Sequence, residues 1–105
     1  MQKSVTVQEA ATLQKGGAIL VDVRELDEFN EVSAPGAILI PLSHIQRDGL
    51  TAFDTADIDP HTEGLLIICR SGGRSGMVCE TLGDNAINVE GGMLAWLAAG
   101  LPTKE

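Results

Sequence analysis

Basic residues are scarce in this chain, and their scarcity limits the partners it can have. The sequence contains fifteen acidic and seven basic residues, which gives a formal net charge of -8 at pH 7. Because a surface of this sign repels polyanions, we expect no binding to nucleic acid. Two of the basic residues, Arg70 and Arg74, nevertheless lie within one stretch of five residues. This local reversal of sign indicates a site for an anion.

Long apolar runs are also missing. The longest ones, such as Gly17–Val21 and Gly36–Pro41, are far shorter than the roughly 20 residues that span a bilayer. The N-terminus has no basic segment followed by an apolar stretch, so nothing indicates export or a membrane anchor within this chain. We therefore expect a cytoplasmic protein.

Cysteine and histidine are too few for a metal site or a disulfide framework. His44 and His61 lack the spaced partners of a zinc site, and the aspartates of segment 54–59 lack the glycine and terminal glutamate of a calcium loop. The two cysteines, Cys69 and Cys79, are expected to be free thiols in a reducing cytoplasm. The sequence thus predicts no bound metal.

Aromatic residues are rare as well, with one tryptophan, two phenylalanines and no tyrosine. The chain is nevertheless 44% hydrophobic and 21% charged over 105 residues, a balance that argues against disorder. A chain of this length buries roughly two-thirds of its unfolded surface without staples. We expect residues 1–105 to form a single domain.

Four short apolar segments have the length of buried strands. Continuous apolar runs of this kind are typical of parallel strands that are covered on both faces. They are the segments 18–21, 37–40, 64–68 and 86–89.

Helix signals lie between these segments. Thr6 and Glu9 have the spacing of a capping box, which predicts a helix over Val7–Lys15. Shorter helices are expected at 25–31 and at 44–47. The polar stretch that follows, from Asp48 to Glu63, is expected to be a long connection.

Several positions in these helices have a predicted orientation. Leu26 and Phe29 should point inward, and Ser43 should cap the helix that follows it. A further helix begins after residue 73, with one face predicted to be buried, and Gly91-Gly92 opens the last helix. The residues of that buried face are Ser75, Val78, Cys79 and Leu82.

The alternation of strands and helices predicts an α/β fold of three layers. We expect a mostly parallel central sheet of four or five strands, with helices on both faces. Ligands of such sheets bind at the carboxyl ends of the strands. The segments expected at that edge are 22–24, 42–43, 69–74 and 91–92.

One of these segments, Cys69 to Arg74, combines the features of a reactive thiol. A cysteine at a helix N-terminus beside arginines commonly has a pKa of about 3.5 to 7.5. Gly72 and Gly73 would let the backbone curl so that several amides point at one anion. A cation such as Arg74 at the start of a helix is unfavourable without an anion or an acidic partner. We expect Cys69 to be a nucleophile.

The segment Cys69–Ser75 resembles the active-site loop of the rhodanese family of sulfurtransferases. Further motifs of the family extend the resemblance over nearly the whole chain, although Val32-Ser33-Ala34 stands where many members have Gly-His-Ile. These motifs are Asp22-Val23-Arg24 with Glu28-Phe29, Pro35-Gly36-Ala37, Gly91-Gly92-Met93-Leu94-Ala95-Trp96 and Ala99-Gly100-Leu101-Pro102.

The resemblance implies a rhodanese-like fold and a sulfurtransferase that needs no external cofactor. Cys69 would take the outer sulfur of a small anionic donor such as thiosulfate, become a persulfide, and pass the sulfur to cyanide or a thiol. The loop residues expected to bind the donor are Arg70, Ser71, Gly72, Gly73, Arg74 and Ser75.

Three other functions are considered. The first is a persulfide-carrying or regulatory module that delivers sulfur to a protein partner and turns over small molecules poorly. The second is a silent interaction domain, which the intact cysteine and arginines argue against. The third is a phosphatase or arsenate reductase, whose loop resembles cysteine, five residues and arginine, whereas four residues separate Cys69 from Arg74.

Other notable side chains are expected to be structural. Cys79 should pack in the core, and Asp22 and Arg24 should fix the architecture through ion pairs, with Glu28 as a candidate partner of Arg24. The core residues expected near the C-terminus are Met93, Trp96 and Leu97.

Overall fold

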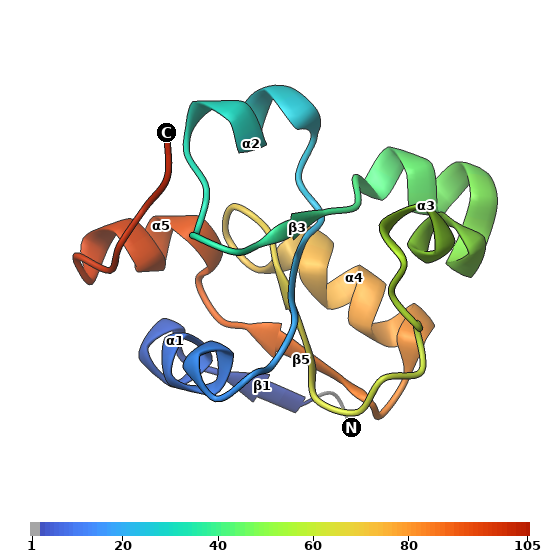
Figure 1. Cartoon of the computed structure of the whole chain (residues 1–105), viewed down its shortest axis with the longest axis horizontal. Coiled ribbons are helices and arrows are strands. Elements are labelled where there is room, and N and C mark those ends of the chain that lie inside the picture. The colour runs from blue at the N-terminus through green and yellow to red at the C-terminus, as the bar shows by residue number, and fades with distance from the viewer. Residues whose placement is uncertain (1–2) are drawn as a thin grey trace.

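Five short strands form one parallel sheet in the computed structural model, which describes residues 3–105 (Figure 1). The order across the sheet is β1-β5-β4-β2-β3, and every pairing of neighbours is parallel. This confirms the predicted α/β class with a parallel sheet. The strands are β1 (Lys3–Val5), β2 (Leu20–Asp22), β3 (Ile38–Leu39), β4 (Leu65–Ile68) and β5 (Ala86–Val89).

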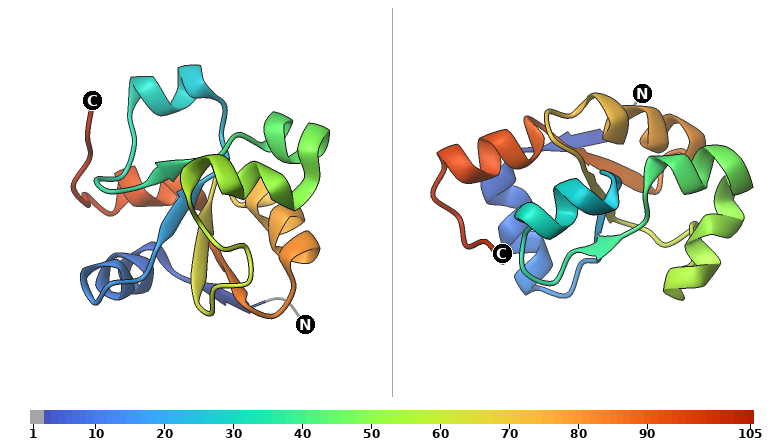
Figure 2. Two further views of the ribbon diagram at one scale, coloured as in Figure 1. Left: turned by 45° about the vertical axis from the view of Figure 1, so that its right-hand side comes forward. Right: turned by 90° about the horizontal axis from the view of Figure 1, so that it is seen from above.

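Helices cover both faces of the sheet, as expected. α1 and α5 pack on one face, whereas α3, α4 and a 3-10 helix, η1, pack on the other (Figure 1, Figure 2). α2 lies beyond the carboxyl end of the sheet. The helices are α1 (Val7–Lys15), α2 (Leu26–Glu31), α3 (Leu42–Asp48), η1 (Gly49–Ala56), α4 (Gly73–Leu82) and α5 (Gly92–Ala98).

The central strand β4 divides the core into two hydrophobic clusters. Leu66 and Ile68 face α1 and α5, while Leu65 and Ile67 face α4 and η1. Successive side chains of a strand point to opposite faces of the sheet. Because helices cover both faces, all four side chains are fully buried. β4 is therefore packed on both faces, and it places the residue that follows it, Cys69, at the carboxyl end of the sheet.

Several local expectations are confirmed. In the capping box of α1, the Thr6 hydroxyl accepts from the Glu9 amide at 3.2 Å, and the Thr6 amide donates to the Glu9 carboxylate at 2.9 Å. The predicted inward face of α4 is buried, and so are Met93 and Trp96. Leu97 was expected in the core, but it is 46% exposed.

Two predictions about α2 and α3 are wrong: the inward position of Leu26 and the capping role of Ser43. Leu26 is 57% exposed, because α2 is held by polar contacts and buries none of its residues. Ser43 does not cap α3, since that helix already begins at Leu42 with Pro41 before it. The Ser43 hydroxyl instead donates to the Glu25 carboxylate at 2.6 Å.

Two elements were not predicted. β1 is an edge strand in which Lys3 and Ser4 are exposed, so it lacks the apolar run of the other strands. The expected connection from Asp48 to Glu63 contains η1, which buries Ala52 and Phe53 beneath an otherwise polar surface. Among residues 3–105, no helix is long and apolar enough to cross a membrane.

Candidate active site

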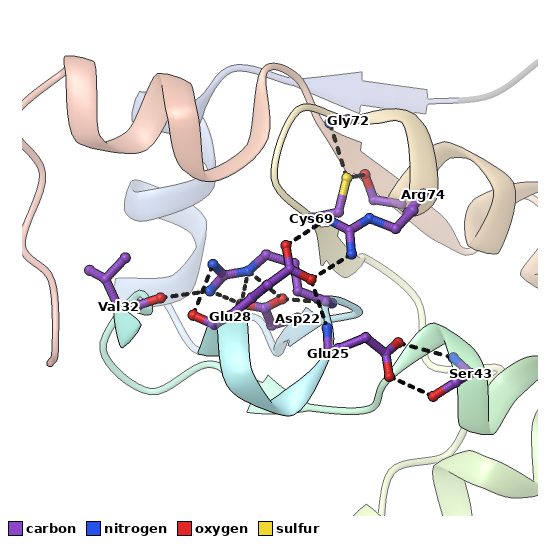
Figure 3. Close-up of polar contacts among 10 residues, drawn as sticks. Asp22, Glu25, Glu28, Val32, Ser43, Cys69, Gly72 and Arg74 are labelled. Atoms are coloured by element: carbon purple, nitrogen blue, oxygen red, sulfur yellow. Dashed lines mark hydrogen bonds and ion pairs between the residues drawn. The ribbon is translucent and has the colours of Figure 1, made fainter. Parts of the chain in front are cut away.

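Cys69 directly follows β4, and a short loop leads from it into α4 (Figure 3). Gly72, the residue before α4, has a φ of 106°, a conformation that side-chain-bearing residues rarely adopt. Gly73 has no positive φ, and a Cβ there would meet no atom within 4 Å. Of the two glycines expected to shape the loop, the geometry requires Gly72 alone.

The sulfur of Cys69 lies among hydrogen-bond donors. It accepts from the Gly72 amide at 3.0 Å and lies 3.3 Å from the Ser75 hydroxyl oxygen, while only 1% of Cys69 is exposed. Burial raises the pKa of the thiol, but hydrogen bonds from the Ser75 hydroxyl and from the amides of Ser75, Gly72 and Ser71 outweigh it. The pKa of Cys69 therefore lies below its ordinary value, which favours the thiolate.

The outer side of the loop is held by the first turn of α5. The Met93 amide donates to the Cys69 carbonyl at 2.8 Å, and the Leu94 amide donates to the Arg70 carbonyl at 3.0 Å. Because C=O and N–H of a trans peptide point in opposite directions, the anchored Arg70 carbonyl turns the Ser71 N–H toward the sulfur. α5 thus orients the Ser71 amide, one of the groups that lower the pKa of Cys69.

This contact requires glycine at the start of α5. A Cβ on Gly92 would lie 2.3 Å from the Cys69 carbonyl oxygen and 2.6 Å from the Arg70 carbonyl carbon. Gly92 also has a φ of 54°. Close packing of α5 against the loop therefore depends on the absence of a side chain at position 92.

Arg74, in the first turn of α4, is paired with Glu28 of α2 (Figure 3). Two hydrogen bonds of 2.7 and 2.9 Å join the guanidinium and the carboxylate, and they lower the pKa of Glu28 to about 2. The ion pair supplies the acidic partner that a cation at a helix start needs. The lowered pKa of Cys69 is thus caused by the Ser75 hydroxyl and by the amides of the predicted nest, whereas the two arginines, which were expected to add to it, are not among its causes.

Arg24 pairs with Asp22, and not with the carboxylate of Glu28 as suggested. Its Nη2 lies 2.8 Å from the Asp22 carboxylate, and the two residues are only 4% and 0% exposed. The same guanidinium donates to the backbone carbonyls of Glu28 and Val32, at 3.3 and 2.7 Å. It therefore ties α2 to the end of β2, which agrees with a structural role.

Arg70 differs from the other arginines at this end of the sheet. It is exposed, and within residues 3–105 its side chain has no hydrogen-bond or ion-pair partner. It lines a groove of about 220 Å³ between α2 and α5, together with Glu31 and the half-exposed Leu94 and Leu97. A cation without an acidic partner at this position can bind an incoming anion.

Cys79 agrees with the expected packing role. It lies in the hydrophobic cluster beneath α4, and burial, together with the charge of Cys69, raises its pKa to about 12. A thiol of this kind is inert near neutral pH. In the described part of the chain, no group of three His, Cys, Asp or Glu side chains could hold a metal ion.

Two contributors to the site were not predicted as such. The Glu28 carboxylate was assigned to Arg24, although the need of Arg74 for an acidic partner was visible in the sequence. Asn88, on β5, accepts from the Ser75 hydroxyl at 2.6 Å and donates to the Gly72 carbonyl at 3.3 Å. The signal for Asn88 was a polar residue in the otherwise apolar segment 86–89.

The Glu28–Arg74 pair predicts a pH-dependent stability. Because the folded-state pKa of Glu28 is depressed to about 2 from 4.5, its contribution is present above pH 4.5 and is lost as the pH falls toward 2. Glu28→Gln should therefore lower the free energy of unfolding by about 1 kcal/mol at pH 7, with a difference that vanishes near pH 2. Urea unfolding at several pH values measures this, with Glu31→Gln on the same helix as control. If Glu28→Gln lowered the free energy of unfolding equally at pH 7 and at pH 2, the ionised Glu28–Arg74 pair would not be the source of the stability.

The chain is similar to known proteins over most of its length. The sequence pattern of the Rhodanese-like domain matches residues 6–99. A putative sulfurtransferase of Bacillus subtilis, YtwF, is 41% identical over 80 residues, which are 73% of this chain and 71% of that protein. Chloroplastic thiosulfate sulfurtransferase 16 of Arabidopsis thaliana is 32% identical over 110 residues, with 96% and 92% of the two chains covered.

Solved structures and longer relatives complete the comparison. A rhodanese-related protein from Thermoplasma volcanium superposes with a TM-score of 0.79 at 27% identity, over 97% of each chain. Some relatives are longer: the chain spans 49% of an uncharacterized Synechocystis protein and 21% of an adenylyltransferase and sulfurtransferase of Pyricularia oryzae. With the domain match over residues 6–99, the chain belongs to the family of rhodanese-like domains.

Proposed function

We propose that this domain is a sulfurtransferase in which Cys69 carries a sulfane sulfur from a small anionic donor, such as thiosulfate, to a thiophilic acceptor. The observation that carries the proposal is the buried sulfur of Cys69, surrounded by the Gly72 amide and the Ser75 hydroxyl. Relatives named as sulfurtransferases support it. The reaction needs a reduced thiol, so we place the protein in the cytoplasm.

The transfer proceeds in two displacements. The Cys69 thiolate attacks the outer sulfur of thiosulfate, and the S–S bond of the donor breaks as sulfite leaves with the bonding pair. The resulting persulfide carries its negative charge on the outer sulfur. Cyanide or a thiolate then attacks that sulfur, the persulfide bond breaks, and the Cys69 thiolate is regenerated. Splitting the transfer through a covalent intermediate lowers each barrier.

The loop stabilises negative charge in both states. The amides of Ser71 and Gly72 are already oriented toward the sulfur, so little reorganisation is needed when charge moves from the thiolate to the persulfide. The low exposure of Cys69 restricts access to small, projecting atoms. The terminal sulfur of a sulfane donor fits this requirement better than a phosphoryl group with its three outer oxygens.

The two arginines of the loop have different roles. Glu28 neutralises Arg74, which therefore holds α2 against the loop and contributes little net charge to the entrance. The exposed Arg70 remains to attract the donor anion toward Cys69. The charge of the rest of the chain is negative, so a local cation is needed for an anionic donor.

A protein acceptor is the second candidate. The groove beside Arg70 is lined by Leu94 and Leu97, each 46% exposed, and these leucines offer an apolar contact that cyanide or thiosulfate does not need. The domain would then act as a persulfide carrier with little turnover of small molecules. Steady-state kinetics with cyanide and with free thiols distinguish the persulfide carrier from the sulfurtransferase of small molecules. A carrier loads sulfur but releases it slowly to cyanide and to free thiols alike.

Sulfur loading tests the proposal. The reduced protein, incubated with thiosulfate and freed of excess donor, should gain the mass of one sulfur atom. Cys69→Ser should gain none, whereas Cys79→Ser should load like the wild type, because Cys79 is a protonated core thiol. Intact-mass spectrometry measures the gain. Sulfur that stays bound to Cys69→Ser, or no gain in the wild type, would refute the mechanism.

A second prediction concerns Arg70. Arg70→Ala should raise the KM for thiosulfate about threefold to tenfold with little change in kcat. The reason is that the lost electrostatic attraction weakens binding of the donor by roughly 1 kcal/mol. The difference from wild type should shrink at high salt. Arg47→Ala, which removes an exposed arginine of α3, is the matched control. A reduced kcat with unchanged KM would assign Arg70 to the chemical step.

A further inference from the structure

Asn88 is a polar residue within a strand whose other members are apolar. Its backbone lies on β5, in register with Ile67 of β4, and its side chain is half-buried under the loop that follows Cys69. An amide in this position is costly unless both of its polar ends are hydrogen-bonded. Both ends are bonded, to Ser75 and to Gly72, and neither contact serves the pairing of the strands.

The orientation of the Asn88 amide is fixed by its two partners. Oδ1 lies 2.6 Å from the Ser75 hydroxyl, and Nδ2 lies 3.3 Å from the carbonyl oxygen of Gly72. The reversed amide would place two acceptors, Oδ1 and the Gly72 carbonyl, against each other. Oδ1 is therefore an acceptor that faces Ser75.

The Ser75 hydroxyl has one proton and two neighbours that can accept it. One is Asn88 Oδ1 at 2.6 Å, and the other is the sulfur of Cys69 at 3.3 Å. When Cys69 is a thiol, the chain is complete: S–H donates to Ser75, and Ser75 donates to Asn88. When Cys69 is a thiolate, the hydroxyl must turn its proton to the sulfur, and Asn88 Oδ1 loses its donor.

We propose that Asn88 is a positioning residue of the sulfur site, which competes with the Cys69 thiolate for the single proton of the Ser75 hydroxyl. The hydroxyl rotates between two acceptors, and Asn88 favours the rotamer that goes with the neutral thiol. The relevance of this rotation for sulfur transfer rests on the proposed function, whereas the ionisation of Cys69 is measured without any donor.

The second contact of Asn88 does not reverse this effect. The Gly72 carbonyl also accepts from the Gly76 amide at 3.0 Å, a shorter hydrogen bond than that from Asn88. Gly72 therefore keeps an anchor when the Asn88 side chain is removed, and its own N–H continues to point at the sulfur. The loss of the Oδ1 acceptor is the main consequence of truncating Asn88.

Asn88→Ala and Ser75→Ala replace no ionisable side chain near the loop. The pKa of Glu28 is lowered to about 2 and that of Cys79 is raised to about 12, so both lie far from the range of the test. A change of midpoint in Asn88→Ala therefore reports on the local hydrogen bonds. The charged and titratable groups near the loop, from β2, α2, the loop and α4, are Asp22, Arg24, Glu28, Arg70, Arg74 and Cys79.

The test is the pH dependence of alkylation of Cys69 by iodoacetamide, followed by peptide mass spectrometry so that Cys79 is counted separately. Asn88→Ala should lower the midpoint by about 0.5 to 1 pH unit, the effect of one hydrogen bond. Ser75→Ala should raise it, and Asn88→Ala should have no further effect in the Ser75→Ala background. Asn85→Ala, outside the site, should leave the midpoint unchanged.

A midpoint that rises or stays constant in Asn88→Ala would overturn the proposal, and so would a shift that persists without the Ser75 hydroxyl. If Asn88→Ala does not fold, Asn88→Asp replaces it: the stronger acceptor should raise the midpoint by about one unit or more, and the rise should shrink in the Ser75→Ala background. An undiminished rise of the midpoint would also overturn the proposal.

Sulfur loading of the wild type is measured separately, so a failure of the transfer mechanism and a failure of the Asn88 role give different results.

Discussion

The site depends on two hydrogen bonds between backbone groups, from the first turn of α5 to the carbonyls of Cys69 and Arg70. They fix the peptide planes of the loop, so that the amide after the anchored Arg70 carbonyl faces the sulfur. The contact is possible because position 92 has no Cβ. A helix from the end of the chain therefore orients one of the amides that lower the pKa of the Cys69 thiol at the end of β4.

The charged side chains act mainly on the position of α2. Arg24 holds the C-terminal end of α2 through the carbonyls of Glu28 and Val32, and Arg74 binds the carboxylate of Glu28. α2 buries no residue, so these contacts replace the hydrophobic packing that holds the other helices. Arg70 is exposed and has no such partner among residues 3–105, which is why we propose that it binds the donor anion while the paired arginines hold α2.

Local signals allowed much of this to be predicted from the sequence. The capping box at Thr6, the four apolar strands and the inward face of α4 each depend on residues close together in the chain, and so does the position of Cys69 at a strand end. The partner of Arg74 lies 46 residues away and was misassigned, since Arg24 is nearer to Glu28 in sequence. The exposure of Leu26 and the burial of Phe53 depend on which surface each segment meets, which periodicity alone does not specify.

The most direct test of the central claim is the pKa of Cys69, measured from the thiolate absorbance as a function of pH in the wild type and in Gly92→Ala. The wild-type midpoint should lie below the ordinary thiol value of about 8.5. The midpoint should be higher in folded Gly92→Ala, because the added methyl group pushes α5 away from the loop carbonyls. A wild-type midpoint at or above the ordinary value, or one that Gly92→Ala leaves unchanged, would contradict the central claim.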